Sequence, residues 1–236
     1  MLFARATSAR TLHVCTTAHG RKIVPLTALA AGAFLWLVRS RLLTWGATDD
    51  EVSRFYPTDE LIPDPDSSVF TMATTLSAPP EKVWPWLAQM GGDRAGWYSW
   101  DRLDHWGLPS SDRIVPEWQN RKVGQHLQNS RDGSNSMSVT LVEPNRTFAL
   151  RANMEFPSRR SFDPSERLPR MYMDGIWSCR LRPTPDGQTR LVARMRGRSP
   201  PKALLRPFGM LLGDPLHFVM QVRQFQNLRA RVSAHA

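Results

Sequence analysis

A single apolar stripe runs along residues 214–232 (DPLHFVMQVRQFQNLRARV), close to the C-terminus of this 236-residue chain. Asp214 is a favourable N-cap residue, and Pro215 suits the first position of a helix. Apolar residues then recur at spacings of three and four, which places them on one helix face: Phe218, Val222, Phe225, Leu228 and Val232. A helix of this length with one apolar stripe has to bury it. We expect it to pack against the concave side of a sheet.

Stretches that alternate apolar and polar residues precede this helix. The alternation is typical of half-buried strands, and it predicts strands at residues 69–76, 137–142, 147–151, 177–182 and 190–196. Pro185-Asp186-Gly187 joins the last two strands and is a strong hairpin signal. Strands that follow one another through short turns indicate an antiparallel sheet. The arginines on the outer face of the last two strands are expected to be solvated.

A helix is predicted directly after the first strand, in residues 77–90 (SAPPEKVWPWLAQM). Ser77 or Pro80 marks its start, because proline is accepted in a first helical turn. Val83, Leu87 and Met90 share one face. The chain is therefore expected to be of the α+β class, with one strand, a helix, several antiparallel strands and a long C-terminal helix.

This order of elements, together with the residues 77–90, resembles the SRPBCC (START-like, polyketide cyclase) superfamily. The segments 45–52 (WGATDDEV), 96–104 (GWYSWDRLD), 112–125 (DRIVPEWQNRKVGQ) and 215–221 (PLHFVMQ) are similar to an uncharacterised bacterial branch of it. The resemblance covers about residues 44–232. It implies a helix-grip fold, in which a curved antiparallel sheet surrounds the long C-terminal helix and encloses an apolar cavity.

The charge distribution argues against a nucleic-acid-binding protein. The net charge is +10, but residues 1–46 hold six basic residues and no acidic one, which leaves +4 for the rest. A mildly basic domain without a recognisable motif does not indicate a phosphate-binding surface. The two cysteines, Cys15 and Cys179, cannot form a disulfide within the domain, and no metal-ligand spacing occurs. We expect no metal and no cofactor, and the sequence leaves the oligomeric state open.

An uncharged, largely apolar run occupies residues 23–38 (IVPLTALAAGAFLWLV) between basic flanks. A membrane span needs about 17–25 residues, so a single-pass anchor at 23–43 is the favoured interpretation. A cleaved signal peptide, with Ala28 and Ala30 at the cleavage site, is the main alternative, and a cytoplasmic location is another. The predicted organisation is a basic tail (1–22), this anchoring helix (23–43), a lead-in segment (44–66) and the helix-grip domain (67–232).

Aromatic and acidic residues gather between the first helix and the second strand. A ligand site needs apolar walls and a few polar groups that fix orientation, and this stretch supplies both. The candidate ligand-binding residues there are Trp97, Tyr98, Trp100, Asp101, Glu117 and Trp118. His217 and Gln221 lie at the edge of, or within, the apolar stripe of the last helix, so they join the list. No catalytic residue is assigned, since no nucleophile motif occurs.

Three functions are compatible with these patterns. The favoured one is binding of a hydrophobic or amphipathic small molecule, lipid-like or polyketide-like, in the cavity. The second is an enzyme of the cyclase or dehydratase kind that uses a cavity His with Asp or Glu as acid and base. The third is a protein-interaction module whose pocket is filled by its own side chains.

Overall fold

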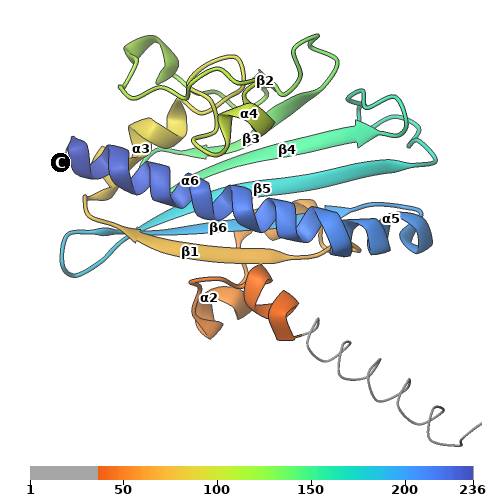
Figure 1. The fold of residues 1–236 in the computed structure, drawn as a ribbon, viewed down its shortest axis with the longest axis horizontal. Helices are drawn as coiled ribbons and strands as arrows, with labels where there is room; N and C mark the ends of the chain where they lie inside the picture. The colour runs from red at the N-terminus through yellow and green to blue at the C-terminus, as the bar shows by residue number, and fades with distance from the viewer. Residues whose placement is uncertain (1–36, 236) are drawn as a thin grey trace, which may run out of the picture. The chain divides into compact units, whose positions relative to one another are not determined.

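The structure, a computed structural model, describes residues 37–235, and residues 39–236 form one compact unit. Its centre is a six-stranded antiparallel sheet in the order β1-β6-β5-β4-β3-β2 (Figure 1). The strands are β1 (Phe70–Leu76), β2 (His126–Gln128), β3 (Ser136–Glu143), β4 (Thr147–Glu155), β5 (Tyr172–Pro183) and β6 (Thr189–Arg198). The sheet is curved, and a register shift between Val139 and Leu141 of β3 interrupts its pairing with β4.

The long helix α6 (Asp214–Ala234) crosses one face of this sheet (Figure 1). Phe225, Leu228 and Val232 are buried in the core, and Phe218 and Val222 pack against it half-buried. The predicted apolar stripe is therefore the buried face. The prediction of an α+β domain with a curved antiparallel sheet and a long C-terminal helix is confirmed.

The predicted N-cap role of Asp214 is wrong, although α6 itself starts at this residue. Helix α5 (Lys202–Phe208) and the short π-helix η3 (Gly209–Gly213) run into α6 without a break, and Gly213 has helical backbone angles. Asp214 is therefore not an N-cap. Its carboxylate instead accepts hydrogen bonds from Arg39 Nε at 2.9 Å and Ser68 Oγ at 2.7 Å.

Helix α3 (Pro80–Ala88) packs against β5 and α6 at one end of the core. Val83, Trp86 and Leu87 are completely or almost completely buried there, and the C-terminal carbonyl of Ala88 accepts a hydrogen bond from Arg121 Nε at 2.7 Å. The segment between α3 and β2 holds only short helices, α4 (Asp101–Asp104) and η2 (Pro116–Trp118). This segment lies above the end of the sheet, beside α6 (Figure 1).

The lead-in segment packs on the sheet through α2 (Asp49–Ser53) and η1 (Pro57–Leu61). Glu51 of α2 accepts hydrogen bonds from Arg190 at 2.8 and 2.7 Å and from Arg182 at 3.2 Å. Asp59 of η1, 2% exposed, accepts hydrogen bonds from Arg194 Nε at 2.9 Å and Nη2 at 3.0 Å.

The prediction that the outer-face arginines are solvated is therefore wrong for Arg190, Arg194 and Arg196. Arg194 is buried, and Arg196 is a second ion-pair partner of Asp59, at 3.2 Å. These arginines attach the lead-in segment to β6, so the segment belongs to the folded unit.

Of the predicted anchoring helix at 23–43, residues 23–36 lie outside the described residues, and residues 37–43 are helical. Across residues 37–235, no helix combines the length and apolar character that crossing a membrane requires.

Candidate functional site

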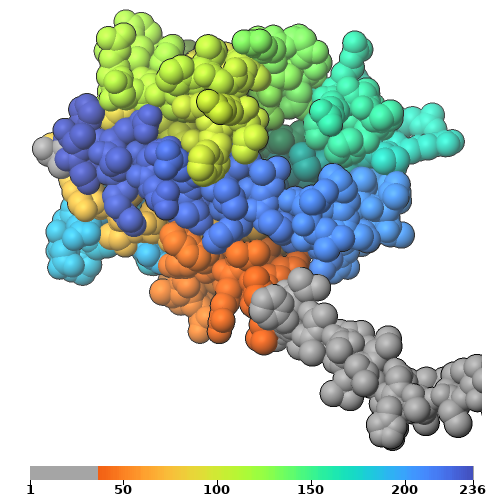
Figure 2. Space-filling view, in the orientation of Figure 1, coloured from red at the N-terminus to blue at the C-terminus, as the bar shows by residue number. Residues whose placement is uncertain are grey.

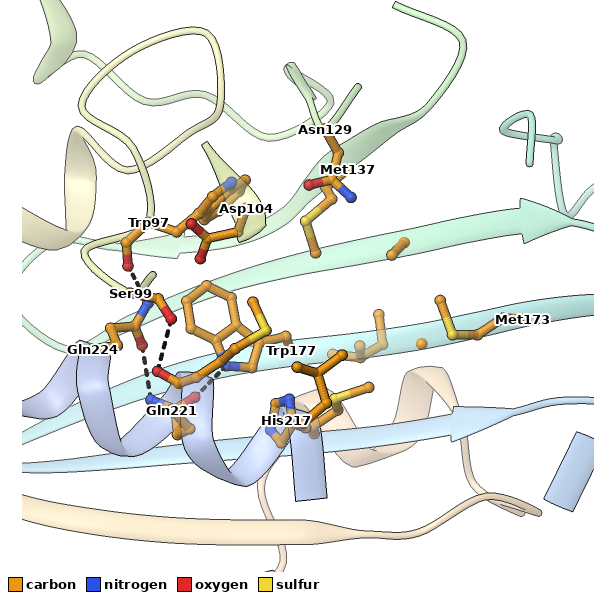
Figure 3. A pocket seen from close by; sticks show the side chains of 16 residues that line it. Trp97, Ser99, Asp104, Asn129, Met137, Met173, Trp177, His217, Gln221 and Gln224 are labelled. Carbon is orange, nitrogen blue, oxygen red and sulfur yellow. Dashed lines mark hydrogen bonds between the residues drawn. The ribbon is translucent and has the colours of Figure 1, made fainter. Parts of the chain in front are cut away.

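A cavity of about 470 Å³ lies between the sheet and α6. Its walls come from β3 to β6, from α6 and from the segment that holds α4 (Figure 3). The space-filling view shows a hollow between the green loop segments and the blue C-terminal helix (Figure 2). Most of the lining is apolar, and it includes Ile176 and Leu216. It is also rich in methionines, whose flexible thioether side chains adapt to irregular shapes: Met137, Met173, Met195 and Met220.

Small residues on neighbouring strands make room for the cavity. Ala152 of β4 pairs with Gly175 of β5, and Met137 of β3 pairs with Ala152 from the other side. A Cβ atom added at Gly175 would have one atom within 4 Å, Arg196 O at an ordinary 3.5 Å. Because neither residue has a side chain that reaches toward α6, the sheet and the helix leave a space here instead of meeting.

A chain of hydrogen bonds runs along one side of the cavity (Figure 3). Trp177 Nε1 donates to Gln221 Oε1 at 3.1 Å, and Gln221 Nε2 donates to Gln224 Oε1 at 2.8 Å. Gln224 Nε2 in turn donates to the carbonyl of Trp97 at 2.8 Å. The chain ties β5 and α6 to the aromatic segment, and it satisfies both glutamine side chains. The main role of Gln221 and Gln224 is therefore to stabilise the cavity wall.

Two polar side chains of the wall have atoms without a partner among the described residues. Trp97 is 6% exposed and its Nε1 donates to nothing. Both carboxylate oxygens of Asp104 are buried and form no hydrogen bond of good geometry, although the Ser99 side chain is close enough to stabilise the charged form slightly. Burial, with a smaller contribution from the nearby carboxylate of Asp101, raises the pKa of Asp104 to about 6. Asp104 is thus an acid whose charge changes close to neutral pH.

His217 faces the cavity from α6, with its ring 4.3 Å from the ring of Phe70, centroid to centroid. The residue is half-buried. Desolvation lowers the pKa of His217 to about 4, because apolar surroundings disfavour the imidazolium form. His217 therefore presents a neutral imidazole to the cavity near pH 7.

Of the predicted ligand-binding residues, the structure brings Trp97, His217 and Gln221 together on the cavity. Tyr98 lies in the core, where its hydroxyl accepts a hydrogen bond from Gln89 Nε2 at 2.7 Å. Trp100 is 44% exposed, beneath the guanidinium of Arg223 at 5.0 Å.

The three other candidates also lie away from the cavity lining. The carboxylate of Asp101 accepts hydrogen bonds from Ser110 N at 3.1 Å and Ser110 Oγ at 2.5 Å, so it fixes the turn after α4. Glu117 is exposed on η2, and Trp118 packs half-buried against the core.

Sequence reasoning did not select Asp104, Ala152 or Gly175 as site residues. Asp104 stands three residues after Asp101 in the same acidic and aromatic segment, and only the fold separates the two roles. Ala152 and Gly175 carry no chemical signal of their own. The pairing that places them side by side links strands 23 residues apart, so no local pattern could reveal it.

The side chains of the described residues offer no cluster of His, Cys, Asp and Glu that could hold a metal ion. Cys179 is fully buried, and burial raises the pKa of its thiol to about 12. A buried thiol of this kind is an inert apolar group.

No protein-family model and no curated protein matches this chain. Among solved structures, a protein from Mesorhizobium loti is 22% identical with a TM-score of 0.41, covering 71% of this chain and 98% of that one. A protein from Chromobacterium violaceum is 17% identical with a TM-score of 0.39 and coverages of 70% and 96%. An uncharacterized protein from Rhizobium leguminosarum is 11% identical with a TM-score of 0.41 and coverages of 70% and 94%. The chain is thus similar to bacterial structural-genomics proteins, at levels that do not bear on its function.

Proposed function

We propose that this chain binds a hydrophobic or amphipathic small molecule, lipid-like or polyketide-like, in the cavity between its sheet and α6. The observation that carries the proposal is the cavity of about 470 Å³, since small-molecule pockets typically measure ~300–1,000 Å³ and have apolar walls with a few polar groups. Methionines and two tryptophans in the wall fit a flexible apolar ligand, because these side chains offer large contact areas.

The proposal includes a helix-grip arrangement of the SRPBCC kind. It is supported by the order of elements, by the residues 77–90 at the start of α3 and by the position of α6 across the sheet. Membrane association through residues 23–38 stays a prediction from the sequence. If that association holds, the ligand could be drawn from the lipid phase.

Native mass spectrometry of the full chain, followed by organic extraction, tests the proposal. A reproducible extra mass that extraction releases is the expected result, and the extract gives the chemical class of the ligand. A protein that shows no extra mass, and that also takes up none of a panel of apolar probes, would overturn the proposal.

Cavity-filling variants show whether the bound mass occupies this cavity. Ala152→Leu and Gly175→Leu add apolar volume to the cavity wall. At Gly175 the added Cβ atom would have one neighbour, Arg196 O at an ordinary 3.5 Å, so we expect the fold to tolerate the added side chain. We expect the double variant to retain its melting temperature and to lose most of the extractable ligand. Ala203→Leu adds the same kind of group at an exposed position of α5 and is the matched control. Equal ligand content in all three proteins would place the ligand elsewhere.

A cyclase or dehydratase remains the second candidate, because two ionisable groups of perturbed pKa, Asp104 and His217, line the cavity. Such groups are typical of acid–base catalysis. If the extracted molecule is converted by the protein, Asp104→Asn and His217→Gln should each abolish turnover while ligand is still bound. Turnover that survives both substitutions would exclude this candidate. The third alternative, an interaction module with a filled core, is disfavoured by the size of the cavity.

A further inference from the structure

An exposed row of apolar side chains, here called the outer stripe, runs along the helical segment that leads into α6. Leu204, Phe208, Leu212, Leu216 and Val219 recur at spacings of four and three, so they share one side of the helix. Their exposed fractions lie between 45% and 62%, and α5 and η3 bury no residue. A surface helix normally turns polar residues outward, so the outer stripe indicates an interaction surface.

Basic residues accompany the outer stripe. Within residues 198–213 the charged residues are Arg198, Lys202 and Arg206, and no acidic residue occurs. Lys202 and Arg206 are exposed, and neither forms an ion pair with any of the described residues. The next carboxylate along the chain, Asp214, is buried and paired with Arg39 at 2.9 Å. An exposed apolar helix face with unpaired bases beside it is typical of helices that lie on anionic bilayers.

The outer stripe also borders an opening of the cavity. Leu216 is about half exposed and at the same time lines the cavity, as do its neighbours His217 and Met220 on α6. Figure 2 shows the hollow directly beside the blue residues of this helix. A membrane in contact with the outer stripe would therefore lie next to this opening, and an apolar molecule would pass between the two with little exposure to water.

The predicted anchor joins the folded unit at the same end of α6. Arg39, the first residue of the compact unit, donates hydrogen bonds to Asp214 at 2.9 Å and to Ser68 Oγ at 2.6 Å. Asp214 is the first residue of α6 and lies between Leu212 and Leu216 of the outer stripe. Because residue 38 precedes Arg39, an anchor at 23–38 would hold the outer stripe close to the bilayer. This connection favours a membrane over a second copy of the chain as the partner.

We infer that the outer stripe docks on the surface of a bilayer that contains anionic lipids. The apolar side chains enter the head-group region, and Lys202 and Arg206 pair with the lipid phosphates. The docking goes beyond the proposed function and does not depend on it, since a protein with an empty cavity would dock equally well.

Hydrogen–deuterium exchange of the full chain, with and without vesicles, tests this docking. Phosphatidylcholine vesicles are compared with vesicles in which roughly a third of the lipid is phosphatidylglycerol. Since α5 and η3 bury no residue, their amides should exchange readily in solution. We expect residues 202–213 to exchange at least about fivefold more slowly with the anionic vesicles and less than about twofold more slowly with the neutral ones, because each base near an anionic surface contributes about fivefold in affinity. This local measurement separates docking from attachment through residues 23–38.

A double substitution and its control assign the effect to the apolar side chains. Phe208→Gln with Leu212→Gln should reduce the slowing to below about twofold, because burying each side chain contributes at least about tenfold in affinity. Phe55→Gln with Leu61→Gln replaces the same residue types at exposed positions of the lead-in segment, on the opposite face of the sheet, and should change nothing. All four side chains are exposed, so both proteins should fold normally.

Neutralising the bases tests the electrostatic part. With Lys202→Gln and Arg206→Gln together, the anionic vesicles should slow exchange no more than the neutral ones do. Unchanged slowing in this protein would contradict the role of the two bases.

Three further results would overturn the inference. One is normal exchange at residues 202–213 in the presence of anionic vesicles, and another is equal slowing in both apolar double variants. The third is slowing without vesicles that grows with protein concentration, which would identify a second copy of the chain as the partner. Docking without any extractable ligand would count against the proposed function alone.

Discussion

At the scale of single residues, Asp104 is a cavity-lining carboxyl group whose surroundings disfavour its charged form. Its oxygens are buried, and the Ser99 side chain offsets the loss of solvation only in part. A carboxyl group in such a place prefers to keep its proton, and this is why its pKa rises from an ordinary value of 3.8 to about 6. Above that pH the carboxyl group ionises in the folded protein, and the net effect is to destabilise the folded state.

The Asp104→Asn variant should therefore be more stable than the wild type, and the gain should depend on pH. Below about pH 3 the carboxyl group is mostly protonated in both folded and unfolded chains, so ionisation contributes almost nothing to the gain. Between pH 4 and pH 6 the folded state holds the proton more tightly, so wild-type stability falls as the pH rises, and above pH 6 the loss is complete. The full shift is worth nearly 3 kcal/mol, which we reduce to about 1–2 kcal/mol because the side chain is partly exposed.

Urea unfolding of both proteins at pH 4.5 and pH 7.5 measures this difference. The amide of the variant can form new hydrogen bonds, but their contribution is the same at both pH values. The change with pH is thus the diagnostic quantity. A variant whose stability differs from the wild type by the same amount at both values would show that Asp104 is not destabilised in its ionised form.

At the scale of secondary-structure elements, most of the sheet followed from the sequence because apolar and polar residues alternate along the strands, even in β1, where six of seven residues are buried. One face meets α6 and the other meets solvent or the lead-in segment, so apolar and polar residues alternate. Strand β5 starts earlier than predicted, at Tyr172, because Asp174 and Gly175 break the alternation while their ladder to β4 and β6 continues. Strand β2 has three residues, too few for a periodic signal.

Helices α5 and η3 were missed for the opposite reason. Pro200, Pro201, Pro207, Gly209 and Gly213 all favour turns when judged locally. In the structure Pro201 precedes the first helical residue, and the two glycines keep helical backbone angles because the long helix that follows continues the same axis. Tertiary continuity thus overrides local preference.

The ion pairs on the outer face lay beyond sequence reasoning because the partners are about 135 residues apart. They also give the sharpest test at this scale. Asp59→Ala leaves the guanidinium of Arg194 buried without its partner, and such a loss typically costs about 3–5 kcal/mol. The measurement is the free energy of unfolding in urea.

A matched control and a double variant keep that test specific. Asp50 forms an exposed pair with Arg54 four residues along α2, so Asp50→Ala should cost no more than about 0.5 kcal/mol. Replacing both Asp59 and Arg194, the latter by Met, should recover much of the loss, because the more deeply buried charge is removed together with its partner. Arg196, the second partner of Asp59, keeps its hydrogen bond to the carbonyl of Pro63. A similar small effect for Asp59→Ala and Asp50→Ala would mean that the buried pair does not hold η1 to β6.

At the scale of the whole molecule, the site depends on contacts that begin well before the predicted domain start at residue 67. The ring of Trp45 lies 6.3 Å from those of Phe218 and Phe225, centroid to centroid, which covers part of α6. The carbonyl of Trp45 accepts a hydrogen bond from Ala73 N at 3.0 Å, at the edge of β1. Gly46 has to be a glycine, since its φ is +72° and a Cβ atom would meet Ala73 O at 2.2 Å.

Two shortened chains test how far the folded unit extends. A chain that begins at residue 37 keeps every contact described above, and we expect its melting temperature and its bound ligand to match those of the full protein. A chain that begins at residue 55 lacks Trp45 and Glu51. Without them Phe218 and Phe225 lose an aromatic cover, and Arg190 loses its carboxylate partner.

The chain that begins at residue 55 should be less stable, because it loses the ring contacts of Trp45 with α6 and leaves the partly buried Arg190 without its carboxylate partner. Since α6 forms one wall of the cavity, a loosened α6 should also release the ligand. Thermal unfolding and native mass spectrometry on the same samples check both effects. If this chain keeps its stability but loses the ligand, residues 37–54 serve the site alone. If it keeps both, residues 37–54 are dispensable for the fold and for the site.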